Sequence, residues 1–181
     1  FGALRLEDLP HYTYEEYCKW EDNWELIYGV AYAVAPAPII EHQSISNKIA
    51  WQLHDVLKEC TECQALLPVD WKIAKDTIVQ PDNSVICHTP MHEAYITKAP
   101  AIIFEILSPS TSKKDKTLKY NLYEEEGVKY YIIVDPSEKM AKVYRLHEGR
   151  YIKLLDASDE VVEFNLEACS QSLTFDFQKI W

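Results

Sequence analysis

Residues 101–107 have the sequence Ala101-Ile-Ile-Phe-Glu-Ile-Leu107, a nearly continuous apolar run that one carboxylate interrupts. Such a run is typical of a strand that is buried on both faces of a sheet. A carboxylate that is buried without a partner is costly, so a cation, a metal ion or exposure at a cleft must compensate Glu105. We therefore predict that this strand lies at the centre of the fold and that Glu105 marks a functional site. The alternative is a strand-end glutamate that is paired with an Arg or a Lys.

The segments around this strand predict the rest of the core. Apolar residues recur with a helical period over residues 41–60. A second helix is expected to end near Glu126, where Gly127 is suited to stop it. The expected order is helix, three strands, helix, strand, with the strands at 66–74, 78–87, 101–107 and 128–134. This order favours an α/β fold with a central mixed β-sheet flanked by helices over a helical bundle or an all-β barrel.

Shorter elements are expected to extend this core. Thr13-Tyr-Glu-Glu16 has the form of a capping box and predicts a helix over residues 14–20. Thr111 or Ser112 is the expected N-cap of the second core helix. Patterns typical of β-hairpins and of edge strands occur towards both ends of the chain. The hairpins are expected at 24–35 and at 140–146 with 151–155, and the edge strands at 161–164 and 173–177.

The composition is that of an ordinary soluble globular protein. The chain has 181 residues, of which 48% are hydrophobic and 26% charged, and we expect residues 1–181 to form one domain. No apolar run approaches the roughly 20 residues that a membrane-spanning helix needs. The first ten residues lack the basic and apolar regions of a signal peptide. We therefore expect a cytoplasmic protein without a membrane partner.

The five cysteines, an odd number without a dense framework, are typical of reduced intracellular thiols. Cys60 and Cys63 form a lone CxxC pair near the expected end of the helix over 41–60. A zinc site would need a second pair of ligands, for which the candidates are Cys87, His88 and His92. The simpler interpretation, which we adopt as the expectation, is a fraying helix end that carries two thiols.

Asp82 is a second carboxylate within a strand-like run, Val79-Gln-Pro-Asp-Asn-Ser-Val-Ile86. Pro81 cannot donate a hydrogen bond to a central ladder, so the backbone there must be irregular or at an edge. Such an irregularity can direct a side chain into a site. Because Pro-Asp-Asn is also ordinary turn chemistry, a turn residue and a metal ligand remain the two interpretations of Asp82.

Several modest motifs become specific in combination. The core motifs are Gln80-Pro-Asp82, Glu105-Ile-Leu-Ser-Pro-Ser-Thr111, Asp115, Lys119, Tyr123 and Gly127-Val-Lys-Tyr-Tyr-Ile-Ile-Val-Asp-Pro136, and upstream of them come Trp24-Glu-Leu-Ile-Tyr-Gly29, Ala35-Pro36 and Glu41-His42. Together they resemble the Uma-two restriction endonuclease family over about residues 10–147. That family is placed in the PD-(D/E)XK nuclease superfamily. The resemblance therefore implies a restriction-endonuclease-like core, whose order of elements is the one that periodicity predicts.

The resemblance also implies a role for each matching residue. Asp82 and Glu105 would lie on neighbouring strands and bind Mg²⁺ (or Mn²⁺), which would polarise a phosphodiester and activate water. The superfamily expects a lysine two residues after the glutamate, but this chain has Leu107 there. A lysine on the following helix is expected to replace it, and Lys119 matches that position. Lys116, one turn away, is the competitor, and a solvated surface lysine is the alternative for either.

Three further residues are candidates for the same site. Glu41 begins the helix over 41–60, from which an acidic residue completes the metal site in some members of the superfamily. A carboxylate that favours the helix dipole is the equal alternative for Glu41. Glu25 interrupts an apolar hairpin strand. His42 is a candidate because histidine titrates near neutral pH, although capping or packing is the commoner role of a histidine near a helix start.

The net charge bears on the partner. A formal charge of −11 counts against a strong nonspecific binder of duplex DNA, but Lys113, Lys114, Lys116 and Lys119 are concentrated on one helix. We predict a Mg²⁺-dependent endonuclease that hydrolyses phosphodiester bonds of DNA. The alternatives are a catalytically inactive nuclease-fold protein that acts as a binding or structural module, and an acidic subunit that works beside a basic partner protein. A homodimer is expected by analogy with superfamily enzymes that cut both strands.

Overall fold

The computed structural model describes residues 5–34, 38–109 and 113–181, apart from the side chains of Leu6 and of residues 113–115. The expected N-cap residues Thr111 and Ser112 and the motif Ala35-Pro36 lie outside the described residues, as do the side chains of Lys113 and Lys114. The cluster of four lysines is therefore described only at Lys116 and Lys119.

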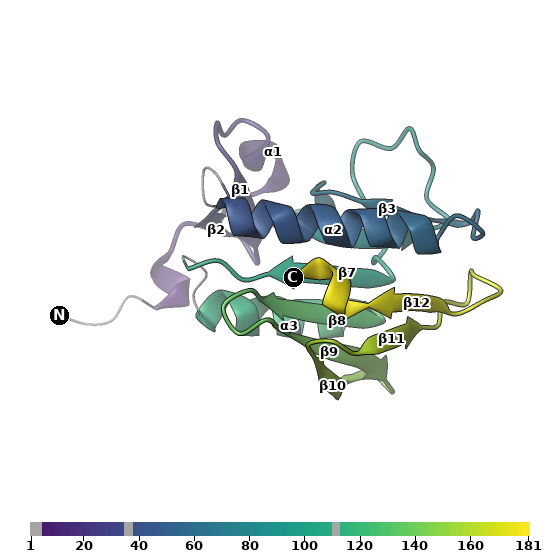
Figure 1. Ribbon diagram of the computed structural model, residues 1–181. Coiled ribbons are helices and arrows are strands. Elements are labelled where there is room, and N and C mark those ends of the chain that lie inside the picture. The colour runs from purple at the N-terminus through teal and green to yellow at the C-terminus, as the bar shows by residue number, and fades with distance from the viewer. Residues whose placement is uncertain (1–4, 35–37, 110–112) are drawn as a thin grey trace.

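A six-stranded mixed sheet forms the centre of the molecule (Figure 1). Its strand order is β10-β9-β8-β7-β6-β3, and β7 and β8 are its parallel pair. The chain crosses between these two strands through α3 (Lys113–Glu126), while α2 (Ile40–Val56) packs on the sheet as well. This architecture confirms the predicted α/β fold with a central mixed sheet and flanking helices. The strands are β3 (Cys63–Leu66), β6 (Asn83–Cys87), β7 (Ile102–Ile106), β8 (Tyr130–Asp135), β9 (Met140–His147) and β10 (Arg150–Ala157).

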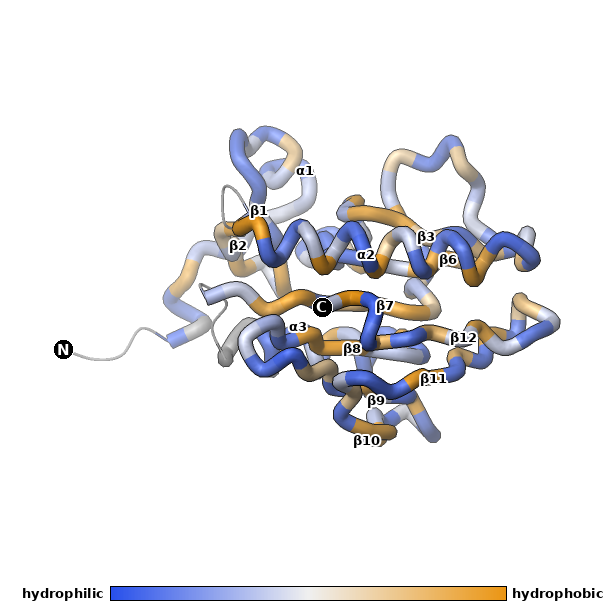
Figure 2. Tube along the Cα trace, viewed as in Figure 1, coloured by the Kyte–Doolittle hydropathy of each residue, from blue (hydrophilic) through white to orange (hydrophobic). Residues whose placement is uncertain are grey.

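Alternation along β7 assigns its side chains to two separate cores. Phe104 and its even-numbered neighbours pack with α2 residues such as Ile49, whereas Ile103 packs with Leu122 of α3. Because strand side chains alternate with a period of two, Glu105 shares the α3 side of the sheet with Ile103. Helix α2 alternates between hydrophobic and hydrophilic residues, as a helix with one buried side should (Figure 2). Among the described helices, none has both the length and the apolar character needed to cross a membrane.

A smaller sheet corrects two of the strand predictions. Its order is β2-β1-β5-β4, built from β1 (Trp24–Ile27), β2 (Val30–Ala33), β4 (Trp71–Ala74) and β5 (Thr77–Val79). The expected strands at 66–74 and 78–87 were each wrong as single strands. Each divides between the two sheets, near Pro68 and at Pro81 respectively. Proline lacks the N–H that a continuous ladder requires, which explains why both runs change sheets there.

Towards both ends of the chain, some elements agree with the predictions and others differ in length or in pairing. The helix expected over 14–20 is the shorter α1 (Tyr14–Tyr17), in which the Glu16 carboxylate accepts a 2.8 Å hydrogen bond from the Thr13 N–H, as a capping box should. The hairpin strands at 24–27 and 30–33, and β9 with β10, agree with prediction. The C-terminal strands β11 (Val161–Phe164) and β12 (Leu173–Asp176) pair with each other rather than extending the central sheet. Their phenylalanines pack around Phe104. This aromatic contact, rather than hydrogen bonding to an edge strand, holds the two strands against the central sheet.

The expectation of reduced cysteines was wrong for the four that lie away from the N-terminus. Disulfides join Cys60 to Cys169 and Cys63 to Cys87, while Cys18 is free and exposed. The helix ends at Val56, before the CxxC pair, and Cys63 lies directly opposite Cys87 in the β3–β6 ladder. Spacing along the chain gave no signal of these contacts, because the fold alone brings Cys169 to Cys60.

Candidate functional site

Asp82 and Glu105 come together at one end of the central sheet. The β6–β7 register pairs Asn83 with Phe104, and continuing it by one residue places Asp82 opposite Glu105. The N–H of Ile106 donates a 2.7 Å hydrogen bond to Asp82 Oδ2 and so holds this carboxylate against β7. The two carboxylates therefore lie on neighbouring chain segments, as the resemblance implied.

Lys119 on α3 contacts two carboxylates at once. Its Nζ lies 2.9 Å from Glu25 Oε1 and 3.4 Å from each Glu105 carboxylate oxygen. Glu25 reaches this point from β1, and its other oxygen accepts a 2.8 Å hydrogen bond from the Gln80 N–H. Partial burial opposes ionisation of Asp135, but hydrogen bonds, above all from the Ser137 hydroxyl, lower its pKa, and the charge of the competitor Lys116 adds a smaller effect. Of the two lysines, the structure places Lys119 beside the candidate ligands.

Tyr123 belongs to the same cluster, although it was not among the predicted site residues. Its hydroxyl donates a 2.8 Å hydrogen bond to Glu105 Oε1, and its buried ring stacks on Trp71. Burial and the nearby Glu105 raise the pKa of Tyr123 well above its ordinary value, so the hydroxyl keeps its proton. A signal was available: Tyr123 follows Lys119 by four residues, which puts both side chains on one face of the helix.

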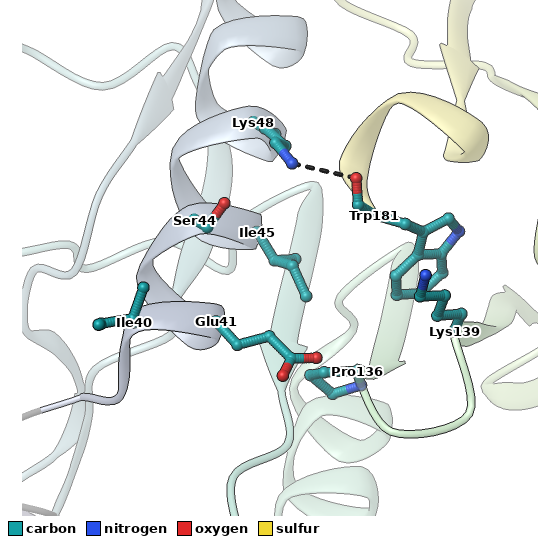
Figure 3. Close-up of a pocket in the computed structure, with 8 residues that line it drawn as sticks. All are labelled: Ile40, Glu41, Ser44, Ile45, Lys48, Pro136, Lys139 and Trp181. Atoms are coloured by element: carbon teal, nitrogen blue, oxygen red, sulfur yellow. Dashed lines mark hydrogen bonds between the residues drawn. The ribbon is translucent and has the colours of Figure 1, made fainter.

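The two candidates at the start of α2 point to different places. His42 Nε2 lies 3.4 Å from Asp82 Oδ2, and their side chains are 13% and 21% exposed. The hydrogen bond to Asp82 raises the pKa of His42. Glu41 instead lines a pocket with Pro136, Lys139 and Trp181 (Figure 3). Successive helix residues point about 100° apart, so α2 can direct only one of this pair to Asp82.

Above about pH 8, where Glu105 is ionised, the cluster carries more negative than positive charge. Three carboxylates, Glu25, Asp82 and Glu105, share one lysine and the titratable His42. Burial, followed by the charges of Asp82 and Glu25, raises the pKa of Glu105 to about 8, although Lys119 opposes this shift. Conversely, Glu105 and Glu25 raise the pKa of Lys119 despite its burial. The predicted alternative of a Glu105–lysine pair is thus present, but the lysine is shared and does not neutralise the cluster.

The carboxylates of this cluster have the chemistry of ligands for a divalent cation, although among the described residues no three of the cluster's ligand groups bring their atoms within 4.8 Å of one another. Carboxylate oxygens are the ligands that Mg²⁺ and Mn²⁺ prefer, and the surplus negative charge is what such an ion would neutralise. Asp82 and Glu105 could contribute from neighbouring chain segments, and Glu25 contacts the same Lys119 as Glu105 does. The side chains of Glu25 and Glu105 are 12% and 13% exposed, so the cluster is mostly shielded from water, where charge interactions are strong.

Binding of a divalent cation is expected to release a proton below about pH 8. Because the pKa of Glu105 is about 8 rather than 4.5, this carboxyl holds a proton at neutral pH that a cation must displace. We expect the Mn²⁺ affinity to rise about tenfold per pH unit from about pH 5 to about pH 8 and then to level off. Calorimetry in buffers with different protonation enthalpies measures the released proton. An affinity independent of pH over this range would contradict the assignment.

The same shift has a consequence for stability without metal. The pKa of Glu105 is higher in the folded chain than its ordinary value of 4.5. Its contribution to the free energy of unfolding is therefore fully present below about pH 4.5 and is lost as the pH rises to about 8.

Comparisons with known proteins identify one matching family model and one solved structure of similar fold. Residues 13–176 match the family model Uma2, which is described as "Putative restriction endonuclease". A crystal structure described as a putative nuclease belonging to DUF820, from Anabaena variabilis, superposes with a TM-score of 0.75. The identity is 22%, and the alignment covers 93% of this chain and 97% of that chain, so this likeness concerns the fold. No curated protein matches the chain.

Proposed function

Because the chain belongs to the Uma2 family, we propose that it is a Mg²⁺- or Mn²⁺-dependent endonuclease that hydrolyses phosphodiester bonds of DNA. The proposal rests above all on the cluster of Glu25, Asp82 and Glu105 around Lys119, which leaves negative charge uncompensated once Glu105 has lost its proton. The nuclease description of the family model and of the structural neighbour supports the same chemistry.

Asp82 and Glu105 are the proposed ligands of the ion, with Glu25 available as a third. A divalent cation held there would polarise the scissile phosphate and lower the pKa of an attacking water. The Ile106 N–H and His42 hold Asp82, while the Tyr123 hydroxyl orients Glu105. These hydrogen bonds keep the ligands in place before the substrate arrives, which is the condition for electrostatic catalysis.

Lys119 is the proposed cationic catalyst. Its ammonium lies within 3.4 Å of the Glu105 carboxylate and its raised pKa keeps it charged at neutral pH. From this position it can donate a hydrogen bond to a non-bridging phosphate oxygen, where negative charge develops during hydrolysis. The superfamily position two residues after the glutamate is Leu107 in this chain, and Lys119 from α3 is proposed to supply the missing charge.

The surface charge predicts how the enzyme meets DNA. With a formal net charge of −11, the chain should bind duplexes weakly, because few phosphates can be neutralised. Lys119 is the proposed phosphate contact, and salt screens such a contact. We therefore expect activity to be highest at low ionic strength.

A cleavage assay tests the proposal. Supercoiled plasmid, linear duplex and single-stranded DNA would be incubated with the protein in Mg²⁺, in Mn²⁺ and in EDTA. We expect nicking or linearisation with either metal and none with EDTA. Binding of Mn²⁺ and DNA without cleavage would favour the alternative of an inactive nuclease-fold binding module. Absence of Mn²⁺ binding above pH 8, where Glu105 has lost its proton, would overturn the metal-dependent assignment altogether.

A further inference from the structure

Four cysteines from three separate parts of the chain come together near the C-terminal end of α2. His42 lies at the opposite, N-terminal end of that helix. Cys60 follows α2, Cys63 begins β3, Cys87 ends β6, and Cys169 lies between β11 and β12. Figure 1 shows the loop between β11 and β12 on the same side of the molecule as the end of α2. The cluster is therefore separate from the carboxylate site and carries no part of the chemistry proposed there.

Three of the four sulfur atoms, those of Cys60, Cys63 and Cys169, lie about as close to one another as ligands of one metal ion would. The Sγ atoms of Cys63 and Cys169 belong to different disulfides, yet they are only 3.8 Å apart. Those of Cys60, Cys63 and Cys169 all lie within 4.8 Å of one another. A tetrahedral zinc site with Zn–S bonds of about 2.3 Å separates its sulfurs by about 3.8 Å. The fourth sulfur, of Cys87, is bonded to Cys63 but lies outside this group of three, so it would have to move closer to Cys60 and Cys169 after reduction.

The pairing pattern also favours a common centre. Cys60 and Cys63 have the two-residue spacing that is frequent among zinc ligands. In a redox-active CxxC motif these two cysteines would bond to each other. Here each of them is turned towards a cysteine from another part of the chain. Both sulfurs of the motif nevertheless lie within 4.8 Å of each other and of the Cys169 sulfur, which supplies three of the four ligands of a zinc site.

We propose that the reduced protein binds one Zn²⁺ through Cys60, Cys63, Cys87 and Cys169. Soft thiolates select zinc, whereas the hard carboxylates at the other site select Mg²⁺ or Mn²⁺. Four protein ligands leave no open position, so the site is structural. It would tie the C-terminal strands to α2 and to the central sheet. Four thiolates around Zn²⁺ carry a net charge of −2.

The two states exclude each other, because the sulfurs that form the disulfides are those that would bind zinc. A water-soluble phosphine converts one state into the other. For each disulfide it breaks one S–S bond, takes up one oxygen atom from water to become the phosphine oxide, and leaves two thiols. Zinc then binds the four thiolates and releases their protons to the solvent.

Alkylation of the full-length protein tests the proposal. The protein would be reduced with the phosphine under nitrogen, incubated with or without Zn²⁺, and labelled with iodoacetamide in the native state. Mass spectrometry of the peptides then gives the labelling rate of each cysteine. With Zn²⁺ we expect labelling at Cys60, Cys63, Cys87 and Cys169 to fall by at least about tenfold, since metal-bound thiolates are shielded. The exposed Cys18 should be labelled equally in both samples and is the internal control.

Cobalt provides a second readout on the same wild-type protein. Co²⁺ bound by four thiolates gives intense visible and near-ultraviolet bands that a carboxylate site does not give. We expect these bands to saturate at about one ion per chain and to disappear on addition of Zn²⁺. Cys169→Ser should abolish them, whereas Cys18→Ser should not. Equal labelling of the four cysteines with and without Zn²⁺, or no thiolate bands with Co²⁺, would overturn the proposal.

Discussion

Glu105→Gln is expected to abolish metal-dependent cleavage while leaving the protein folded. Removing a carboxylate ligand forfeits about 4 kcal/mol of transition-state charge stabilisation, which corresponds to a loss of rate of about 10³-fold. The amide also removes a buried group whose charged form is unfavourable, as its pKa of about 8 indicates. Without metal, the variant should therefore unfold at a urea concentration no lower than that of the wild type at pH 8. Plasmid cleavage rates and urea denaturation measure the two quantities.

A matched control shows whether the loss of cleavage is specific to Glu105 or follows from removing any shielded carboxylate. The side chain of Glu124 is 14% exposed, close to the 13% of Glu105, and it too comes from the α3 side of the sheet. Its carboxylate accepts a 2.7 Å hydrogen bond from the Tyr151 N–H. We expect Glu124→Gln to keep its cleavage rate and Asp82→Asn to lose it as Glu105→Gln does. Cleavage by Glu105→Gln within about threefold of the wild-type rate would contradict the assigned role, since a ligand should contribute far more.

Lys119→Met is expected to lower both stability and catalysis, but not metal affinity. Removing the lysine leaves the shielded carboxylates of Glu25 and Glu105 without their shared cation. Breaking a buried ion pair in this way costs about 3 kcal/mol in the free energy of unfolding. Cleavage should fall by about 10²-fold to 10³-fold, as for loss of one donor to a developing charge. Affinity for Mn²⁺ should stay the same or rise, because a competing positive charge has gone.

The effect of Mn²⁺ on the stability of Lys119→Met distinguishes a catalytic role of Lys119 from a role in balancing charge alone. Since a divalent cation replaces the missing ammonium, saturating Mn²⁺ should restore much of the stability of Lys119→Met without restoring cleavage. Lys116→Met, one turn earlier on α3, is the matched control and should change neither property beyond the small effect of a surface charge. If Lys119→Met cleaved DNA at the wild-type rate once metal was bound, the lysine would serve only to balance charge in the metal-free protein.

The sequence by itself determined the core and the identity of its two central carboxylates. Continuous apolar runs mark β7 and β8 as strands covered on both faces, and a carboxylate within such a run has few stable roles. The helical period over 41–60 likewise predicted α2, because face periodicity depends only on neighbouring residues. Pro81 signalled an irregular backbone beside Asp82, and the chain does change sheets there.

Only the tertiary structure decided which residues join those two carboxylates. Lys116 and Lys119 lie three residues apart on one helix, so local periodicity could not choose between them; the packing of α3 on the sheet does. Glu25 reaches Lys119 because β1 pairs with β5 in the second sheet, and Cys169 reaches Cys60 across 109 residues of chain. Such contacts depend on the path of the loops between elements, which short-range patterns do not encode. The composition of the site is therefore a property of the folded chain.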